Sequence, residues 1–216
     1  MDPLHFCIAL GPVAVYLLLL GAINLSRRPF VTTGARDLAA LGVAVCGFVV
    51  AGPMELFLPE AAARRFGPFV WLLLLAFYGL CLTLWVLLMR PRLVIYNISV
   101  DQLRPILASV VVEVDKEARW AGDSLVLPQL GVQLHIESFV TLRNVQLVSA
   151  GPRQSYVGWR RLEVALRQAF RGTRAAPNPY GFFLVSFGVI IASMITIWMV
   201  SDQAGLAQAL GEMFRR

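Results

Sequence analysis

Charged side chains are scarce in this chain. Only 15% of its 216 residues are Asp, Glu, Lys or Arg, against about 25% in an ordinary soluble protein. Lysine is nearly missing, because Lys116 is the only lysine among 19 basic residues. Such a bias toward arginine is typical of GC-rich bacterial genomes, so we expect a bacterial protein. With 58% hydrophobic residues and a mean hydropathy of +0.69, the composition favours an integral membrane protein.

Cysteine and histidine are rare as well. The three cysteines, Cys7, Cys46 and Cys81, all lie in apolar segments, and no pair brackets a polar loop. We therefore predict free thiols packed as small hydrophobic groups and no disulfide framework. Of the two histidines, only His5 lies near a long apolar segment, which excludes a haem held between two intramembrane histidines.

Motifs for common chemistry are missing too. The sequence contains no G-x-x-x-x-G-K-[ST], G-x-G-x-x-G, H-E-x-x-H, C-x-x-C or G-x-S-x-G. It also lacks a motif for binding DNA or RNA, so the net charge of +6 indicates lipid headgroups rather than nucleic acid. We predict no cofactor, no metal and no catalytic residue. A non-catalytic protein is favoured, and enzymatic activity is left open.

Four long apolar segments dominate what is present, at residues 4–25, 38–58, 68–89 and 180–200. Each has the length of about 20 residues that a helix needs to cross a ~30 Å hydrocarbon layer. No basic residue precedes the first segment, which predicts a retained span rather than a cleaved signal. The predicted fold is an integral membrane α-helical bundle of four transmembrane helices.

The remaining segments predict the rest of the domain organisation. Residues 1–89 would carry three spans, residues 90–179 a small inserted cytoplasmic α+β domain, and residues 201–216 an amphipathic tail helix after the last span. Small residues at helical spacing, among them Gly47 and Gly188, predict close contacts between helices of the bundle.

The polar stretch has a mixed pattern. Ser99 and Gln102 form a capping box before a helical run, although the β-branched residues 111–114 leave helix or strand open there. Gly122-Asp123 predicts a hairpin turn, and residues 132–137 alternate between apolar and polar as in a half-buried strand. We expect the nearby Asp115, Glu117 and Asp123 to be solvated charges.

A second amphipathic helix is predicted near the end of the domain, over residues 156–170. Its apolar face could pack on the sheet, which is the favoured interpretation. Alternatively, its arginines could hold it at an anionic lipid surface. Its predicted apolar face consists of Trp159, Leu162, Leu166, Ala169 and Phe170.

The distribution of arginine predicts the orientation. Seven arginines near span ends lie on the side of the domain, and four lie on the other side. Because positive charge favours the cytoplasm, we predict a multi-pass protein of the bacterial inner membrane with residues 90–179 cytoplasmic and both termini outside. The seven are Arg27, Arg28, Arg36, Arg90, Arg92, Arg171 and Arg174, and the four are Arg64, Arg65, Arg215 and Arg216.

Glu55 is the one ionisable residue clearly inside a predicted span. An intramembrane carboxylate is costly and often functional, but this one lies about one turn from the interface and could pair with Arg64 or Arg65. His5 is expected at the same level. These four residues are the candidate functional residues, with a structural role for Glu55 favoured.

Two classes of function remain. The favoured one is a non-catalytic scaffold, assembly factor or accessory subunit of a membrane complex, which lies in the lipid bilayer and docks other membrane-protein subunits through its cytoplasmic domain. The alternative is a transport-related or enzymatic membrane protein that uses Glu55 and His5 near the outer face. Glu55→Gln separates the two, because only the alternative requires the carboxylate.

Overall fold

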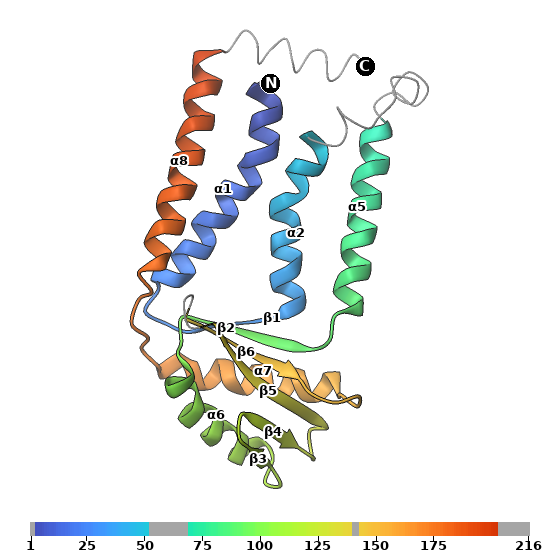
Figure 1. Cartoon of the computed structure of the whole chain (residues 1–216), viewed down its shortest axis with the longest axis vertical. Helices are drawn as coiled ribbons and strands as arrows, with labels where there is room; N and C mark the ends of the chain where they lie inside the picture. Colours follow the sequence, from blue (N-terminus) through green and yellow to red (C-terminus); the bar gives the residue numbers. More distant parts are fainter. Residues whose placement is uncertain (1–2, 52–68, 140–142, 203–216) are drawn as a thin grey trace. The chain divides into compact units, whose positions relative to one another are not determined.

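The computed structural model describes residues 3–51, 69–139 and 143–202. The chain divides into two compact units, one mostly helical and one built around a sheet. Figure 1 shows the elements of each unit. The predicted tail helix after Asp202 lies outside the described residues.

In its described residues, the helical unit is formed by four apolar helices. They are α1 (Pro3–Leu25), α2 (Gly34–Ala51), α5 (Phe69–Leu88) and α8 (Tyr180–Ser201). In the described part of the chain, two apolar segments, Leu4–Leu25 in α1 and Tyr180–Ser201 in α8, are long and apolar enough to cross a membrane. The protein is therefore helix-rich, with two candidate membrane-spanning helices.

Small residues lie where these helices meet. A Cβ atom on Gly47 of α2 would lie 2.0 Å from the carbonyl oxygen of Ile8 in α1. A Cβ atom on Gly188 of α8 would lie 3.0 Å from Cγ of Leu18, also in α1. Both glycines therefore permit the close helix contacts that their spacing predicts.

Two further contacts complete this layer of helices. Ala14 of α1 is buried with Ile191 and Ile195 of α8. The hydroxyl of Tyr78 in α5 donates a 2.7 Å hydrogen bond to the carbonyl oxygen of Gly42 in α2. The helices thus lie side by side in the order α8, α1, α2, α5 (Figure 1).

The second unit contains a six-stranded antiparallel sheet with the strand order β1-β2-β6-β5-β4-β3. Gly122 adopts a φ of 64° in the β3–β4 turn, as the predicted hairpin requires. The strands are β1 (Phe30–Thr33), β2 (Arg92–Tyr96), β3 (Arg119–Ala121), β4 (Ser124–Leu127), β5 (Val132–Phe139) and β6 (Asn144–Ser149).

Two helices cover one face of this sheet, α6 (Val100–Val114) and α7 (Tyr156–Ala169), and α7 leads into a 3-10 turn at Phe170–Gly172. Their buried side chains form one core with alternate residues of the strands. The capping box at Ser99 is present, and α6 continues through residues 111–114 because Val110 and Val111 belong to its buried face. Trp159, Leu162, Leu166 and Phe170 are buried in the same core, which confirms the packing of the second helix on the sheet.

Strand β1 is an element that the sequence pattern did not reveal. It lies between α1 and α2 and pairs with β2, with Val31 opposite Ile95. Ion pairs reinforce this edge: the buried Glu163 of α7 contacts Arg36 at 2.9 Å and Arg167 at 2.7 Å. The connection between α1 and α2 is therefore part of the sheet unit.

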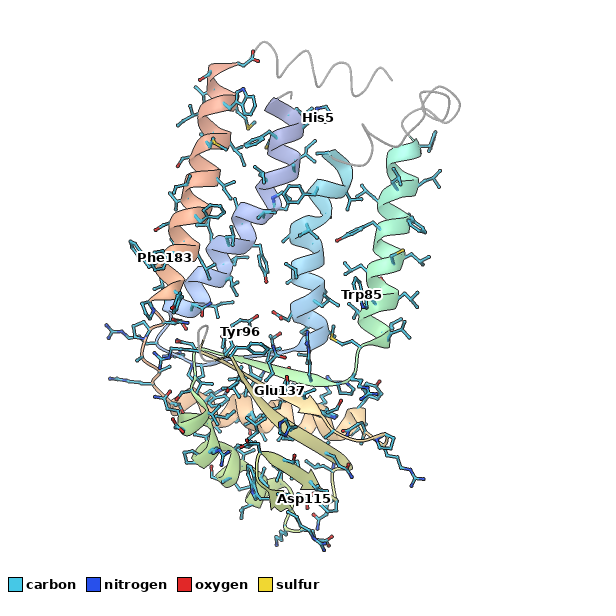
Figure 2. The ribbon with its side chains drawn as sticks, in the orientation of Figure 1. His5, Trp85, Tyr96, Asp115, Glu137 and Phe183 are labelled. Atoms are coloured by element: carbon cyan, nitrogen blue, oxygen red, sulfur yellow. The ribbon has the colours of Figure 1, made fainter. Side chains whose placement is uncertain are left out.

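The expectation that Asp115 is solvated was wrong. Asp115 is 1% exposed, and its carboxylate accepts hydrogen bonds from the backbone N–H groups of Glu117, Gln129 and Leu130 at 3.0, 2.9 and 3.3 Å. A buried carboxylate is tolerated when backbone donors surround it. Asp115 (Figure 2) thus joins the end of α6 to the loop before β5. Asp123 is half exposed and paired with Arg104.

Candidate functional site at the start of helix α7

Of the four residues singled out in the sequence, the structure places one. His5 is a half-buried residue near the start of α1, labelled in Figure 2. Glu55, Arg64 and Arg65 lie outside the described residues, so the couple between His5 and Glu55 stays a prediction. Within residues 3–51, 69–139 and 143–202, no group of three His, Cys, Asp or Glu side chains could hold a metal ion.

A hydroxyl–imidazole pair lies on the face of the sheet opposite α6 and α7. Ser124 on β4 is in register with His135 on β5, and Oγ of Ser124 lies 3.1 Å from Nδ1 of His135. His135 is exposed, as its alternating position predicts. Facing polar side chains on adjacent strands commonly form such pairs, so we interpret this contact as part of the sheet surface.

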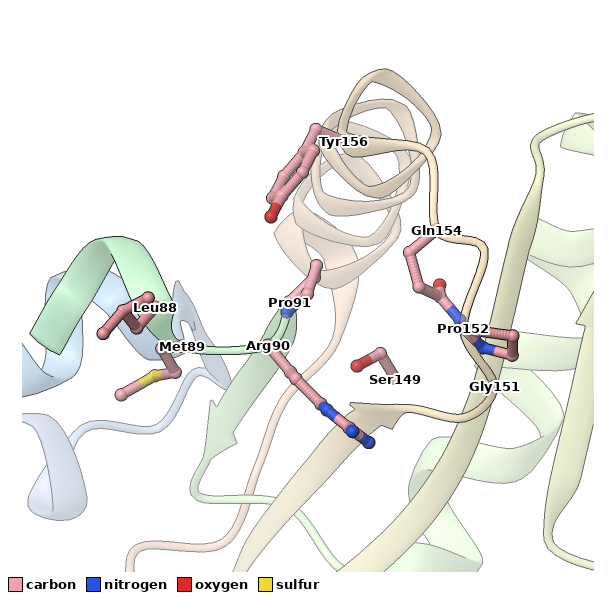
Figure 3. A pocket seen from close by; sticks show the side chains of 9 residues that line it. All are labelled: Leu88, Met89, Arg90, Pro91, Ser149, Gly151, Pro152, Gln154 and Tyr156. Atoms are coloured by element: carbon pink, nitrogen blue, oxygen red, sulfur yellow. The ribbon is translucent and has the colours of Figure 1, made fainter.

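The sheet unit contains a larger feature, a cavity of about 630 Å³ where β2 begins and β6 ends, next to the first turn of α7. This volume lies in the range of about 300–1,000 Å³ that is usual for small-ligand sites. Figure 3 shows its lining side chains, which are Leu88, Met89, Arg90, Pro91, Ser149, Gly151, Pro152, Gln154 and Tyr156.

Ser149 is the unusual member of this cavity. It is the last residue of β6 and follows Val145 and Leu147 on the core face of that strand. Ser149 is 7% exposed, and among the described residues its hydroxyl has no hydrogen-bond partner. An unsatisfied buried polar group costs about 1–3 kcal/mol, so this hydroxyl is a position where a bound group would be stabilised.

A cation and a phenol accompany this hydroxyl. The hydroxyl of Ser149 is directed toward the side chain of Arg90 (Figure 3), while Tyr156 extends from α7 toward Pro91. Arg90 and Tyr156 are both exposed, so their polar ends are accessible. Among the described residues, those that line the cavity include no Asp or Glu, so the Arg90 guanidinium is the one formal charge among them.

The wall of the cavity is held by hydrogen bonds. Nε2 of Gln154 donates to the carbonyl oxygens of Gln133 and Ala150 at 3.0 and 2.6 Å, and Oε1 of Gln154 accepts from Nε1 of Trp159 at 2.9 Å. Ser155 caps α7 by accepting from the N–H of Gly158 at 3.1 Å. The N-terminal end of α7, which carries a partial positive charge, is therefore fixed beside the cavity.

The solvent-facing side of α7 forms a second, shallower surface, which we call the α7 outer face. Val157 is 64% exposed and Val164 48% exposed, and Arg160 and Arg161 are exposed between them. They border a groove of about 340 Å³. The outer face consists of Val157, Arg160, Arg161, Val164, Ala165 and Gln168.

Sequence reasoning used Arg90 only as an orientation signal and passed over Ser149. One signal was available: along β6 the buried positions are Val145, Leu147 and Ser149, so a hydroxyl occurs where the alternation calls for an apolar side chain. The cavity that this hydroxyl faces could not be inferred, because β2, β6 and α7 come together only in the folded sheet unit.

Comparisons with protein-family models, with curated proteins and with solved structures gave no match.

Proposed function

We propose that this protein is a four-span membrane protein whose sheet unit acts as a rigid scaffold and docks another membrane-protein subunit. Two helices have the length and apolarity for spans, and α5 is a further 20-residue helix without a charged residue. Large apolar side chains are exposed on these helices: Trp85 of α5 is 69% exposed and Phe183 of α8 is 70% exposed (Figure 2). Lipid would cover such surfaces.

The observation that carries the scaffold proposal is the way the chain enters the sheet unit. Residues 21–38 belong to it together with residues 88–182, so it contains the end of α1, the start of α2, the end of α5 and the start of α8. Each of the four described apolar helices therefore begins or ends in the sheet unit. A connector of this kind suits a scaffold that docks a partner subunit.

Asparagine side chains strengthen one of these connections. The backbone N–H of Asn178 donates to the carbonyl oxygen of Asn24 at 2.9 Å, and the two buried side chains contact each other at 3.3 Å. The N–H of Ala175 donates to the carbonyl oxygen of Arg27 at 2.9 Å. The last turn of α1 and the residues after it are thus held to the segment before α8 within the sheet unit, and this supports a structural role.

The orientation follows from charge. Arginines on the side of the sheet unit favour placing that unit in the cytoplasm, with both termini outside, in a bacterial inner membrane. The α7 outer face would then be available to a cytoplasmic surface of a partner subunit. Its mixture of valines and arginines suits a partner that offers acidic and apolar side chains, since complementary charge steers association and apolar contact stabilises it.

Site-specific photocrosslinking tests the docking proposal. A photoreactive residue at Val164 is compared, in native membranes, with the same residue at the exposed Glu137 on the opposite face of the sheet. We expect one discrete crosslinked protein from position 164, none from position 137, and loss of the product when Arg160 and Arg161 are both replaced by Glu. Equal products from both positions, or none from position 164, would contradict docking through α7.

A further inference from the structure

We propose that the cavity at the start of α7 binds a phosphate group, and that this phosphate is carried by the headgroup of an anionic phospholipid. The assignment to lipid rests on the membrane placement proposed above. The assignment to phosphate rests on the cavity itself.

Three features of the cavity favour a phosphate group. The Ser149 hydroxyl is buried and has no partner among the described residues, so it can donate to a phosphate oxygen. Arg90 offers a planar guanidinium, which matches two phosphate oxygens at once. The first turn of α7, fixed by the cap at Ser155, adds the partial positive charge that favours anions at helix N-termini.

The size of the cavity argues against a single trapped water as its occupant. One water molecule takes about 30 Å³ of liquid volume, and the cavity measures about 630 Å³. A water could satisfy the Ser149 hydroxyl, but the space beside it has room for a much larger group. A phosphate with its attached glycerol or headgroup fills the space and uses both polar groups.

The apolar part of the lining favours lipid as the source of the phosphate. Leu88 is the last residue of α5 and is 73% exposed, and Tyr156 is 71% exposed. Arg90 follows two residues after Leu88, so a membrane-spanning α5 would place this arginine at the headgroup level. Arginine at the cytoplasmic end of a span and tyrosine at the interface are the usual contacts of anionic headgroups.

Lipid retention by the purified full-length protein provides the test. The protein is placed in nanodiscs of phosphatidylcholine with 20% or no phosphatidylglycerol, and bound lipid is measured by native mass spectrometry after release. Arg90→Gln removes the charge and Ser149→Ala removes the hydroxyl. Arg160→Gln serves as the control, because it removes an exposed arginine of the α7 outer face that does not line the cavity.

We expect one retained phosphatidylglycerol per chain. Arg90→Gln should weaken its binding by about tenfold or more, as expected for a charge-assisted hydrogen bond, and Ser149→Ala by about three- to tenfold. Arg160→Gln should leave it unchanged. Ser149→Ala should not lower the thermal stability of the lipid-free protein, because the hydroxyl that it deletes has no hydrogen-bond partner among the described protein groups.

A second arm identifies the source of the phosphate. Inorganic phosphate and glycerol 1-phosphate are added to lipid-free protein, and the shift in melting temperature is recorded. If these soluble anions bind as tightly as the lipid and depend on Arg90 and Ser149, the phosphate site stands and the lipid assignment fails. If Arg160→Gln weakens binding as much as Arg90→Gln, or if neither cavity variant changes it, the proposal is overturned. Photocrosslinking from Val164 in the Arg90→Gln and Ser149→Ala variants shows separately whether partner docking persists.

Discussion

Asp115 offers the sharpest test of the sheet unit. It is buried, whereas Glu117, another acidic residue beside the β3–β4 hairpin, is exposed. Asp115 is 1% exposed and accepts three backbone hydrogen bonds. A hydrogen bond to a charged group contributes about 1.5–3 kcal/mol. Asp115→Ala leaves two loop amides, those of Gln129 and Leu130, without their acceptor and should destabilise the domain by about 3–5 kcal/mol.

Hydrogen exchange of the full-length protein in detergent measures this effect locally. In Asp115→Ala, the amides of Gln129 and Leu130 should lose about 2–3 kcal/mol of protection, which corresponds to exchange roughly 30- to 150-fold faster. Asp115→Asn keeps one acceptor oxygen, so its exchange rates at Gln129 and Leu130 should lie between those of the unmodified protein and those of Asp115→Ala. Glu117→Gln is the matched control and should change nothing measurable. If Asp115→Ala and Glu117→Gln gave the same exchange rates, the burial of Asp115 and its role in holding this loop would be refuted.

Three further predictions concern the helices and the topology. Gly47→Val should lower the stability of the protein in detergent by about 1–3 kcal/mol or more, because the added Cβ meets a backbone oxygen at 2.0 Å. Gly11→Ala should not lower it, because nothing lies within 4 Å of a Cβ at that position. Equal melting temperatures for the two variants would contradict the α1–α2 contact. In a cysteine-free background, Asp123→Cys should resist an impermeant thiol reagent in intact cells and react after lysis; labelling of intact cells would reverse the proposed orientation. Glu55→Gln should leave expression and complex formation nearly intact, since a near-surface ion pair contributes about 0–1 kcal/mol; complete loss of function with normal folding would favour the transport or enzyme alternative.

Much of the secondary structure could be predicted because its signals are local. The apolar segments at residues 4–25 and 180–200 correspond to α1 and α8, the capping box to α6, and Gly122-Asp123 to the β3–β4 hairpin. Each of these signals depends on neighbouring residues alone: an uninterrupted apolar length, a side chain that caps its own helix, or a turn that requires positive φ. Such features form from local interactions, so they do not depend on which distant segments pack against them.

The candidate site could not be predicted in the same way, because its parts are separated in sequence. Arg90 follows α5, Ser149 ends β6 and Tyr156 begins α7, and nothing local in the sequence says that they share a cavity. The same holds for β1, a four-residue strand that exists because β2 offers it an edge.

Burial of polar groups was likewise decided by tertiary structure. In the sequence, Asp115 cannot be distinguished from a solvated acidic residue beside a turn. Its three backbone donors come from residues up to 15 positions away. By itself, the sequence determined which segments are apolar and which helices and turns can form, because those properties depend on local chemistry. Only the folded structure decided which polar groups are satisfied and which, like the Ser149 hydroxyl, face a cavity, because hydrogen bonding in a core depends on groups that chain topology brings together.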